Sequence, residues 1–386
     1  MELANILETE GRPIRSRRFS VLQVGKFYPP HMGGMETHLQ ALCGELQKSV
    51  DLQVIVASDD HSAAQDTLKG VSVNRVPTRL TLASTPLCPG MIAKIRACQS
   101  EIVHLHFPNP MAVLAYLASG HRGRLVVTYH SDMVRQKFLG PLFEPLLHLA
   151  LRRSSAIIVT SPNYLSTSSV LARHRDRCAV IPLGIPLEEF GRDQAASVAQ
   201  VREKYGERII VSVGRLVYYK GFEHLIRAMT KVQGKLLIVG EGPLRNKLST
   251  LAAELAIADR VVFMGKIDHQ LLVSCYHAAK VFAMPSILRS EAFGLVQVEA
   301  MAAGLPVVNT QLDSGVPYVS LHQQTGLTVP PRNPDALAAA INKLLDDGEL
   351  RLSFGRAARL RAEQEFSVEV MAARTFSLYD QIMSAK

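Results

Sequence analysis

The sequence predicts an α/β protein made of two doubly wound domains, each a parallel sheet covered by helices on both faces. Its 386 residues exceed what one hydrophobic core usually holds. Of these residues 47% are apolar, so a globular rather than a disordered chain is expected. Short β-branched runs alternate with helical segments along the whole chain, which is typical of parallel sheets with crossover helices.

The β-branched runs fall into two series of five. The first series is FSVLQV (19–24), DLQVIVA (51–57), EIVHLH (101–106), RLVVTY (124–129) and SAIIVT (155–160). The second is RIIVSV (208–213), KLLIV (235–239), RVVFM (260–264), KVFAM (280–284) and LPVV (305–308). Each series is long enough to form its own sheet.

A break between the two series marks the predicted domain boundary. In VIPLGIPLEEF (180–190), Pro182, Gly184 and Pro186 interrupt regular structure. We therefore expect a mobile lead-in over 1–18, a first domain over 19–186, a second over 187–365 and a helical segment over 366–386. Two such domains facing each other would place the carboxyl ends of both sheets around an interdomain cleft.

Composition excludes several classes of protein. The formal charge is +9, but basic residues do not alternate with aromatic ones and there is no Trp, so no nucleic-acid partner is expected. The five cysteines form no CxxC pair, which disfavours disulfides and structural zinc and favours reduced core thiols. No apolar run reaches the ~20 residues of a membrane span or resembles a signal peptide. A cytoplasmic location is predicted.

The loop after the first strand contains a glycine pair. Gly33 and Gly34 precede a helix in which Leu39, Leu42 and Leu46 keep helical spacing. Backbone N–H groups at such a helix start can bind an anion, although an ordinary strand-to-helix turn explains the glycines equally well. The spacing is not GxGxxG, which disfavours a dinucleotide cofactor.

Histidines follow two strands of the first series. His130 comes directly after RLVVTY, at a carboxyl strand end, and is the favoured contact to a bound sugar. His106 ends EIVHLH and is a weaker candidate, while His104 lies on the same side of that strand. A lone histidine is more often structural, so the preference for His130 depends only on its position at the carboxyl end of the strand.

Loops of the second series combine glycine with charge. In VSVGRLVYYKG, Arg215 and Lys220 follow Gly214, and fixed cations stabilise the charge that a diphosphate leaving group acquires. The next loop, VGEGPLR, carries Glu241 and Gly242. Solvated loop charges would explain any one of these segments, but their recurrence at one sheet edge favours an anion site.

Two carboxylates give the strongest signal. In SEAFGLVQVEAMAAGLPVV, Glu291 lies on a loop and Glu299 within the helix that Phe293, Gly294 and Leu295 open. Carboxylates accept hydrogen bonds from vicinal diols, and the helix start favours phosphate. Together these groups suit a nucleotide-diphosphate sugar.

At this point the chain resembles a known family. The Glu-x7-Glu motif preceded by GRLVYYKG and VGEGPLR looks like the donor site of the retaining glycosyltransferases of family 4, of bacterial polysaccharide-assembly type. KFYPPHMGGMETH, TYHSD, VIPLGI and TGLTVPP match the family in order, over about residues 19 to 345. The resemblance implies the GT-B fold, two Rossmann-like domains, with the C-terminal helix returning to the first.

The resemblance also implies roles. Arg215 and Lys220 would bind the diphosphate, Glu291 the sugar hydroxyls and Glu299 the ribose. The remaining implied donor contacts are Gly33, Gly34, Glu241, Gly242, Ile267, Phe293, Gly294 and Leu295, with His130 near the reactive carbon. We expect His130, Arg215, Lys220 and Glu291 to be catalytic. Some members of the family carry a Glu between the two residues that correspond to Arg215 and Lys220, where this chain has LVYY.

The implied reaction is front-face transfer of a hexose with retention. No Asp-x-Asp motif occurs, which predicts that neither a metal nor another cofactor is needed. The donor would be GDP- or UDP-linked, with GDP-mannose favoured. The acceptor would be a lipid-linked or glycan molecule in surface polysaccharide or glycolipid synthesis.

A basic segment, residues 122–177, suggests a further partner. Its basic residues are Arg122, Arg124, Arg135, Lys137, Arg152, Arg153, Arg173, Arg175 and Arg177. Docking on an anionic membrane, at the inner face of the plasma membrane, and a core helix with a solvated basic face explain it equally well. Pro141 and Pro145 are expected to prevent a long regular helix here.

Two other functions remain open from sequence. A nucleotide-sugar epimerase could use the same fold, but it would need an acid/base set that the Arg215, Lys220 and Glu291 pattern does not supply. A non-catalytic scaffold that binds a sugar nucleotide is the third hypothesis. The presence of Arg215, Lys220 and both glutamates disfavours it.

Overall fold

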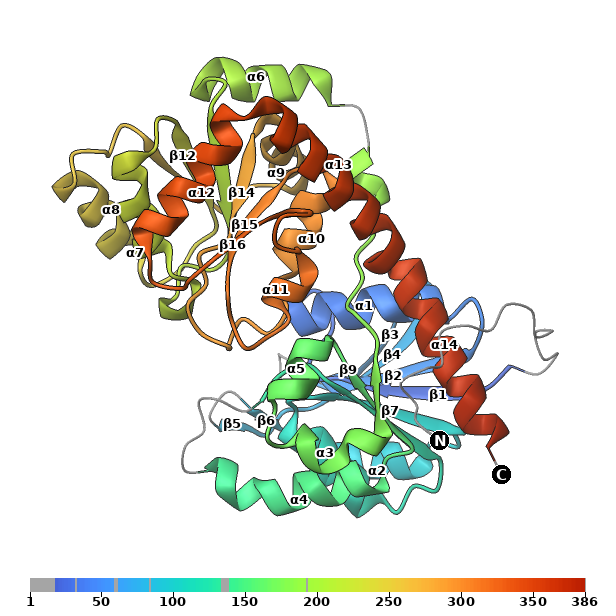
Figure 1. Ribbon diagram of the computed structural model, residues 1–386. Helices are drawn as coiled ribbons and strands as arrows, with labels where there is room; N and C mark the ends of the chain where they lie inside the picture. Colours follow the sequence, from blue (N-terminus) through green and yellow to red (C-terminus); the bar gives the residue numbers. More distant parts are fainter. Residues whose placement is uncertain are drawn as a thin grey trace. The chain divides into compact units, whose positions relative to one another are not determined.

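Two sheets organise the chain, each in its own unit (Figure 1). The computed structural model describes residues 18–31, 33–58, 62–82, 85–132, 139–191 and 194–385. Unit 1 comprises Met1–Gly184 and Val368–Lys386, and unit 2 comprises Ile185–Ser367. The predicted lead-in over 1–18 lies outside the described residues except for Arg18.

Unit 1 contains an eight-stranded sheet in the order β10-β9-β8-β7-β1-β2-β4-β3. Its strands are β1 (Ser20–Val24), β2 (Asp51–Ala57), β3 (Ala64–Leu68), β4 (Val71–Val76), β7 (Ile102–Phe107), β8 (Arg124–Tyr129), β9 (Ala156–Val159) and β10 (Cys178–Val180). All neighbours pair in parallel except β3 with β4. A small antiparallel pair, β5 (Leu80–Leu82) and β6 (Thr85–Leu87), stands apart.

Helices cover both faces of this sheet. They are α1 (Gly34–Leu46), α2 (Gly90–Ala97), α3 (Pro110–Ser119), α4 (Leu139–Arg153), α5 (Pro162–Thr167) and α14 (Val368–Ser384), with the 3-10 turn η2 (Leu171–Arg177). Helix α14 packs beside α1, and α2 beside α3 (Figure 1). The predicted apolar face of α1 is confirmed, since Leu39, Leu42 and Leu46 are buried.

Unit 2 contains a six-stranded sheet in the order β13-β12-β11-β14-β15-β16, parallel throughout. Its strands are β11 (Ile209–Val213), β12 (Lys235–Val239), β13 (Val261–Gly265), β14 (Val281–Ala283), β15 (Val307–Thr310) and β16 (Gly326–Val329). The five strands predicted for this half are therefore confirmed, and β16 was missed. Strands β11, β12, β14 and β15 are buried almost throughout, which explains their continuous apolar runs, whereas the edge strand β13 buries only Val261.

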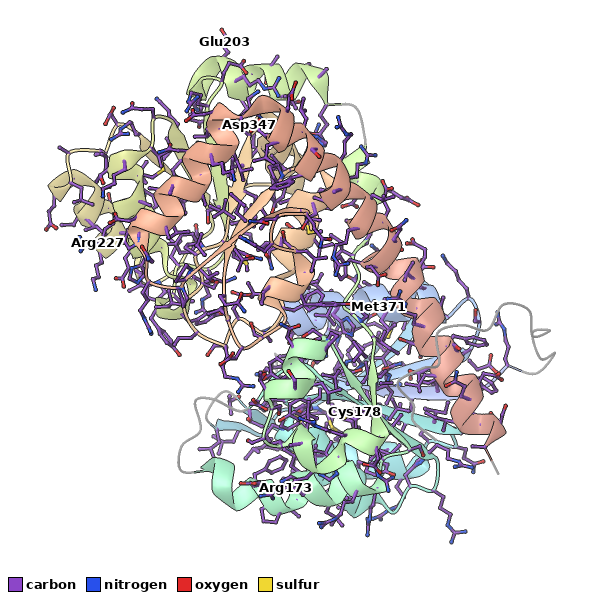
Figure 2. The ribbon with its side chains drawn as sticks, in the orientation of Figure 1. Arg173, Cys178, Glu203, Arg227, Asp347 and Met371 are labelled. Atoms are coloured by element: carbon purple, nitrogen blue, oxygen red, sulfur yellow. The ribbon has the colours of Figure 1, made fainter. Side chains whose placement is uncertain are left out.

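The helices of unit 2 begin with α6, which follows the break. They are α6 (Ala195–Tyr205), α7 (Phe222–Ala228), α8 (Arg245–Glu254), α9 (His269–Ala278), α10 (Leu295–Ala302), α11 (Val316–Val319), α12 (Pro334–Asp346) and α13 (Gly348–Glu365), with 3-10 turns η3 (Glu188–Gly191), η4 (Tyr218–Lys220) and η5 (Met229–Lys231). One core cluster joins α7, α8 and α12 to the sheet. Charged side chains such as Glu203 on α6 and Arg227 on α7 are exposed (Figure 2).

Three expectations need correction. The sheet of unit 1 is not wholly parallel, because the edge strand β3 pairs antiparallel with β4, and the polar sequence of β3 carries little apolar signal. Helix α4 continues through Pro145, since Leu147 and Leu151 beyond it are buried and tertiary packing outweighs the lost backbone bond. All five cysteines are free, but Cys98 is only half-buried.

Candidate functional site

The carboxyl edge of the unit 2 sheet gathers most of the predicted residues. Strands β13, β12, β11 and β14 are consecutive neighbours, so the loops that follow them meet at one edge. These loops and the start of α10 carry the predicted donor residues of this unit. They are Arg215, Lys220, Glu241, Gly242, Ile267, Glu291, Phe293, Gly294, Leu295 and Glu299.

Glycines let two of these loops touch backbone to backbone. A Cβ on Gly240 would lie 2.2 Å from the Gly214 carbonyl oxygen, and one on Gly242 would lie 2.5 Å from that of Leu216. Both contacts are far below van der Waals distance. The Leu216 N–H donates to the carbonyl of Glu241 at 2.8 Å, which holds the loops together.

A buried ion pair lies at the centre of this edge. The Nζ atom of Lys220 is 2.6 Å from Oε2 of Glu291, and each residue is 9% exposed. The Ser286 hydroxyl donates to the same carboxylate oxygen at 3.1 Å. The Ile287 N–H donates to the Tyr219 carbonyl at 2.8 Å, so the two loops that carry the pair are also bonded through their backbones.

The pair keeps Lys220 charged. Burial alone would lower the pKa of Lys220, but the charge of Glu291 and its hydrogen bond outweigh burial, and the pKa is raised. A buried charge is tolerated only when it is paired. Arg215, by contrast, is exposed on the same loop, so its cation is accessible to a ligand.

Helix α10 supplies a second set of groups. Its N-cap, Gly294, has a φ of 79°, the left-handed region that favours glycine, and the amides of the first turn begin at Leu295. One turn further on, Glu299 accepts a hydrogen bond from the Tyr276 hydroxyl at 2.7 Å. Burial raises the pKa of Glu299, while this hydrogen bond acts in the opposite direction.

The remaining predicted positions of unit 2 differ in exposure. Glu241, in the loop after β12, is exposed, and Ile267, in the loop after β13, is half-buried. Phe293 is buried and stacks edge to face on Phe366, with ring centroids 5.8 Å apart. Its side chain therefore belongs to the core, and only its backbone is available to a ligand.

Unit 1 holds the other three predicted residues. Gly33 is the N-cap of α1 and Gly34 its first residue. His130 follows β8, and its backbone N–H donates to the Phe107 carbonyl at 2.9 Å. Its ring is buried, with Nε2 3.2 Å from Nδ1 of His106. The expectation that His104 and His106 share one side of β7 is confirmed, since their rings stack at 4.6 Å.

Sequence reasoning missed the residues that hold these side chains in place. Ser286 and Tyr276 bond the two glutamates, and Thr310 donates to the Ser286 carbonyl at 2.5 Å. In unit 1, His38 was missed. A signal existed for Ser286, which directly follows a buried strand and Pro285, but Tyr276 lies in a helix whose pattern shows only packing.

Chemically, the edge of unit 2 combines cations, free helix N–H groups and carboxylates. The cations and N–H groups suit phosphate, and the carboxylates suit hydroxyl groups. A ligand with both a phosphate and a sugar fits this combination.

Comparisons with known proteins agree with this chemistry. Residues 193–361 match the model for glycosyl transferases group 1, and residues 32–189 match the model for glycosyltransferase family 4. A D-rhamnosyltransferase of Pseudomonas aeruginosa is 33% identical over 90% of this chain and 92% of its own. The chain belongs to glycosyltransferase family 4.

Two further relatives of this family 4 chain are mannosyltransferases. The O-antigen chain mannosyltransferase C of Escherichia coli is 29% identical, covering 95% of this chain and 99% of its own. The GDP-mannose-dependent alpha-(1-6)-phosphatidylinositol monomannoside mannosyltransferase of Mycolicibacterium smegmatis is 31% identical, covering 93% and 97%.

Among solved structures, the sucrose-phosphate synthase of Thermosynechococcus elongatus superposes with a TM-score of 0.78 at 25% identity, covering 95% of this chain and all of that one. The α/β architecture with two parallel sheets is thus the GT-B fold, as the sequence predicted. As a family 4 member, the protein is a retaining glycosyltransferase, and enzymes of this family use nucleotide-sugar donors.

Proposed function

We propose that this glycosyltransferase moves a hexose of manno configuration from a GDP-linked donor to a lipid-linked or glycan acceptor in surface polysaccharide or glycolipid synthesis. The observation that carries the donor site is the buried Lys220–Glu291 pair at the sheet edge. The choice of sugar rests on the relatives, which transfer mannose or D-rhamnose, its 6-deoxy form.

Each site residue receives a role in this proposal. Arg215 and Lys220 bind the diphosphate and stabilise its charge as the glycosidic bond breaks. Glu291 accepts hydrogen bonds from hydroxyls of the transferred sugar, and Glu299 from the ribose. The amides of Gly294 and Leu295 bind phosphate, and Glu241, Gly242, Ile267 and the backbone of Phe293 complete the donor contacts. From unit 1, Gly33 and Gly34 border the phosphates and His130 contacts the sugar.

The proposed transfer needs no metal ion. Arg215 and Lys220 supply the positive charge at the diphosphate that a divalent ion supplies in other transferases. The leaving diphosphate itself helps to deprotonate the acceptor hydroxyl, so that the new bond forms on the face from which the old one leaves. EDTA is therefore expected not to lower the rate, and loss of activity that a divalent ion restores would contradict this.

A donor panel tests the proposal. GDP-mannose, GDP-D-rhamnose, UDP-glucose and ADP-glucose are compared by thermal shift, because a ligand of the native state raises Tm. We expect a shift with both GDP sugars, abolished by Lys220→Met and retained by Lys247→Ala, an exposed lysine of the same unit. A shift only with UDP- or ADP-glucose would refute the donor assignment. No shift with any donor would refute the site.

We also propose that the basic segment contacts an anionic membrane. Arg152 and Arg153 end α4 and are exposed, as is Arg173 on η2 (Figure 2), while Leu146 is 36% exposed. Arg135 and Lys137 lie outside the described residues. No described helix is long and apolar enough to cross a membrane. Sedimentation with liposomes should increase with the fraction of anionic lipid, and an unchanged bound fraction would remove this proposal.

A further inference from the structure

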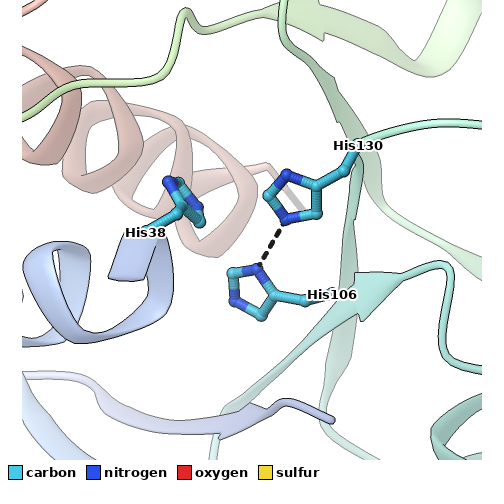
Figure 3. A group of neighbouring side chains, drawn as sticks. All are labelled: His38, His106 and His130. Carbon is cyan, nitrogen blue, oxygen red and sulfur yellow. Dashed lines mark hydrogen bonds between the residues drawn. The ribbon is translucent and has the colours of Figure 1, made fainter. Parts of the chain in front are cut away.

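Three imidazoles converge inside unit 1 (Figure 3). His38 comes from α1, His106 from the end of β7 and His130 from the residue after β8. Each offers one ring nitrogen, and these three atoms lie within 4.8 Å of one another. All three residues are buried, with exposed fractions of 4%, 2% and 7%.

His38 is the unusual member of this cluster. Neither of its ring nitrogens has a hydrogen-bond partner among the residues that the structure describes. A buried polar group without a partner is costly and calls for an explanation. Its ring instead packs edge to face against the two other imidazole rings. Its centroid is 5.5 Å from that of His106 and 4.9 Å from that of His130.

The hydrogen-bond network determines which nitrogen of His106 is free. The Gln23 amide nitrogen donates to the Tyr379 hydroxyl at 3.0 Å, so the Gln23 carbonyl oxygen faces Nε2 of His106 at 2.8 Å. With the Gln23 amide in this orientation Nε2 carries the proton, and Nδ1 has a lone pair that points toward His130. A histidine whose second nitrogen is bonded in this way is typical of a metal ligand.

Distances within the cluster fit a tetrahedral ion. Two ligands about 2.05 Å from zinc lie about 3.3 Å apart. Nδ1 of His106 and Nε2 of His130 are already 3.2 Å apart. The His38 nitrogen needs to approach by up to about 1.5 Å, which a rotation of its ring allows because no hydrogen bond holds it.

We propose that His38, His106 and His130 form a binding site for one zinc-like transition-metal ion, with the fourth coordination position left for a non-protein ligand such as a water molecule. Three neutral imidazoles with one open position suit Zn²⁺ or Co²⁺ and not Mg²⁺ or Ca²⁺, which prefer oxygen. This ion is distinct from any metal at the diphosphate. Binding moves the proton of the His130 Nε2 to Nδ1.

The protonation state of the cluster supports the proposal. Burial lowers the pKa of His38 to about 4. Burial, and then the neighbouring imidazoles, lower the pKa of both His106 and His130 well below the ordinary value. The ligands are therefore neutral near pH 7, and protons do not compete with the metal there.

A second histidine pair in unit 1 provides a matched control. His148 and His174 are buried to a similar extent, and their ring nitrogens are 2.8 Å apart. Within the described part of the chain this pair has no third imidazole in ligand range. His38→Phe keeps an aromatic ring but removes a ligand, and His174→Gln removes a histidine of equal burial outside the cluster.

The experiment is a titration of chelator-treated protein with Co²⁺, followed by its visible absorption. Wild type and His174→Gln should bind one Co²⁺ with the intense visible bands of a tetrahedral ion. His38→Phe should lose more than about 100-fold in affinity, since even second-shell changes cost 10- to 100-fold. His38→Gln serves as a second variant, and circular dichroism of the metal-free proteins confirms folding.

Several outcomes would overturn the site. These are no tetrahedral bands with wild type, bands that persist in both His38 variants, or bands that disappear in His174→Gln. An intense thiolate-to-cobalt band in the near ultraviolet would assign the ion to a cysteine instead. None of these readouts depends on transfer, so they also stand if the proposed function fails.

One consequence rests on the proposed role of His130. If that residue contacts the sugar, an ion bound to its ring withdraws it from this contact. Zn²⁺ should then inhibit transfer by wild type and by His174→Gln, and EDTA should reverse the inhibition. Tight Co²⁺ binding without inhibition would retain the metal site and refute the role of His130.

Discussion

The two units place polar side chains at the same kind of position, the carboxyl ends of parallel strands, but bury them differently. In unit 2 a lysine and a glutamate are buried as an ion pair at 2.6 Å. In unit 1 the buried groups are imidazoles whose pKa values are lowered by burial. A charge can be buried only beside its opposite, whereas histidine avoids the cost by remaining neutral. The units should therefore respond to different perturbations.

The largest expected effect is the loss of one partner of the ion pair. Lys220→Met leaves the Glu291 carboxylate buried and unpaired, and should lower the free energy of unfolding by about 3–5 kcal/mol. Urea unfolding at pH 7 measures this. Lys231→Met is the control, because Lys231 pairs with Asp335 at 2.8 Å on the surface and should cost less than about 1 kcal/mol. Equal losses of unfolding free energy in Lys220→Met and Lys231→Met would contradict the expectation that the buried ion pair matters more than the surface pair.

The second-largest expected effect is that lowering the pH destabilises unit 1 more than unit 2. The unfolded state protonates His38 near its ordinary pKa of 6.5, but the folded state only near about 4. The stability that the neutral ring contributes is therefore fully present above pH 6.5 and is lost as the pH falls toward 4. By linkage this one group accounts for a loss of about 2 kcal/mol between pH 7 and pH 5.

The variant His38→Phe should remove that share of the pH dependence. Hydrogen exchange followed by mass spectrometry reads unit 1 and unit 2 separately at each pH. An unchanged pH dependence in unit 1 would mean that His38 is protonated in the folded state.

A smaller effect should come from the glycine contacts in unit 2. A methyl group on Gly242 would meet the backbone of Leu216, so Gly242→Ala should cost about 1–2 kcal/mol. An added Cβ on Gly44, inside α1 of unit 1, would meet no described atom within 4 Å apart from its own helix backbone and chain neighbours, and Gly44→Ala should stabilise by about 0.5–1 kcal/mol. The sign of the change in Tm tests both, and stabilisation by Gly242→Ala would contradict the close loop packing.

The smallest effect concerns Tyr276. Tyr276→Phe removes the hydrogen bond to Glu299, worth about 1 kcal/mol. If Glu299 binds the ribose, the KM for the donor should rise about fivefold while kcat is unchanged. A fall in kcat at constant KM would instead place Glu299 in the chemical step.

Much of the fold could be predicted from the sequence because parallel strands buried on both faces read as continuous apolar runs. The ten predicted strands are present, and β3, β4, β5, β6, β10 and β16 were missed. β3 is an edge strand with a polar sequence, β4 alternates buried valines with polar residues, and β5, β6 and β10 have only three residues each, so these five lack a continuous apolar run. Unit 2 begins at Ile185, within the break over 180–190, while the boundary expected from sequence lay after residue 186. Glycine and charge at strand ends indicated which edge of unit 2 carries a site.

Only the tertiary structure decided which side chains meet. Lys220 and Glu291 are far apart in sequence, and they pair because β11 and β14 are neighbours in the sheet order. His38 reaches His106 and His130 because α1 packs near the ends of β7 and β8. Periodicity reports which face of an element is buried. Convergence of polar groups depends on strand order and helix packing, which local sequence does not encode.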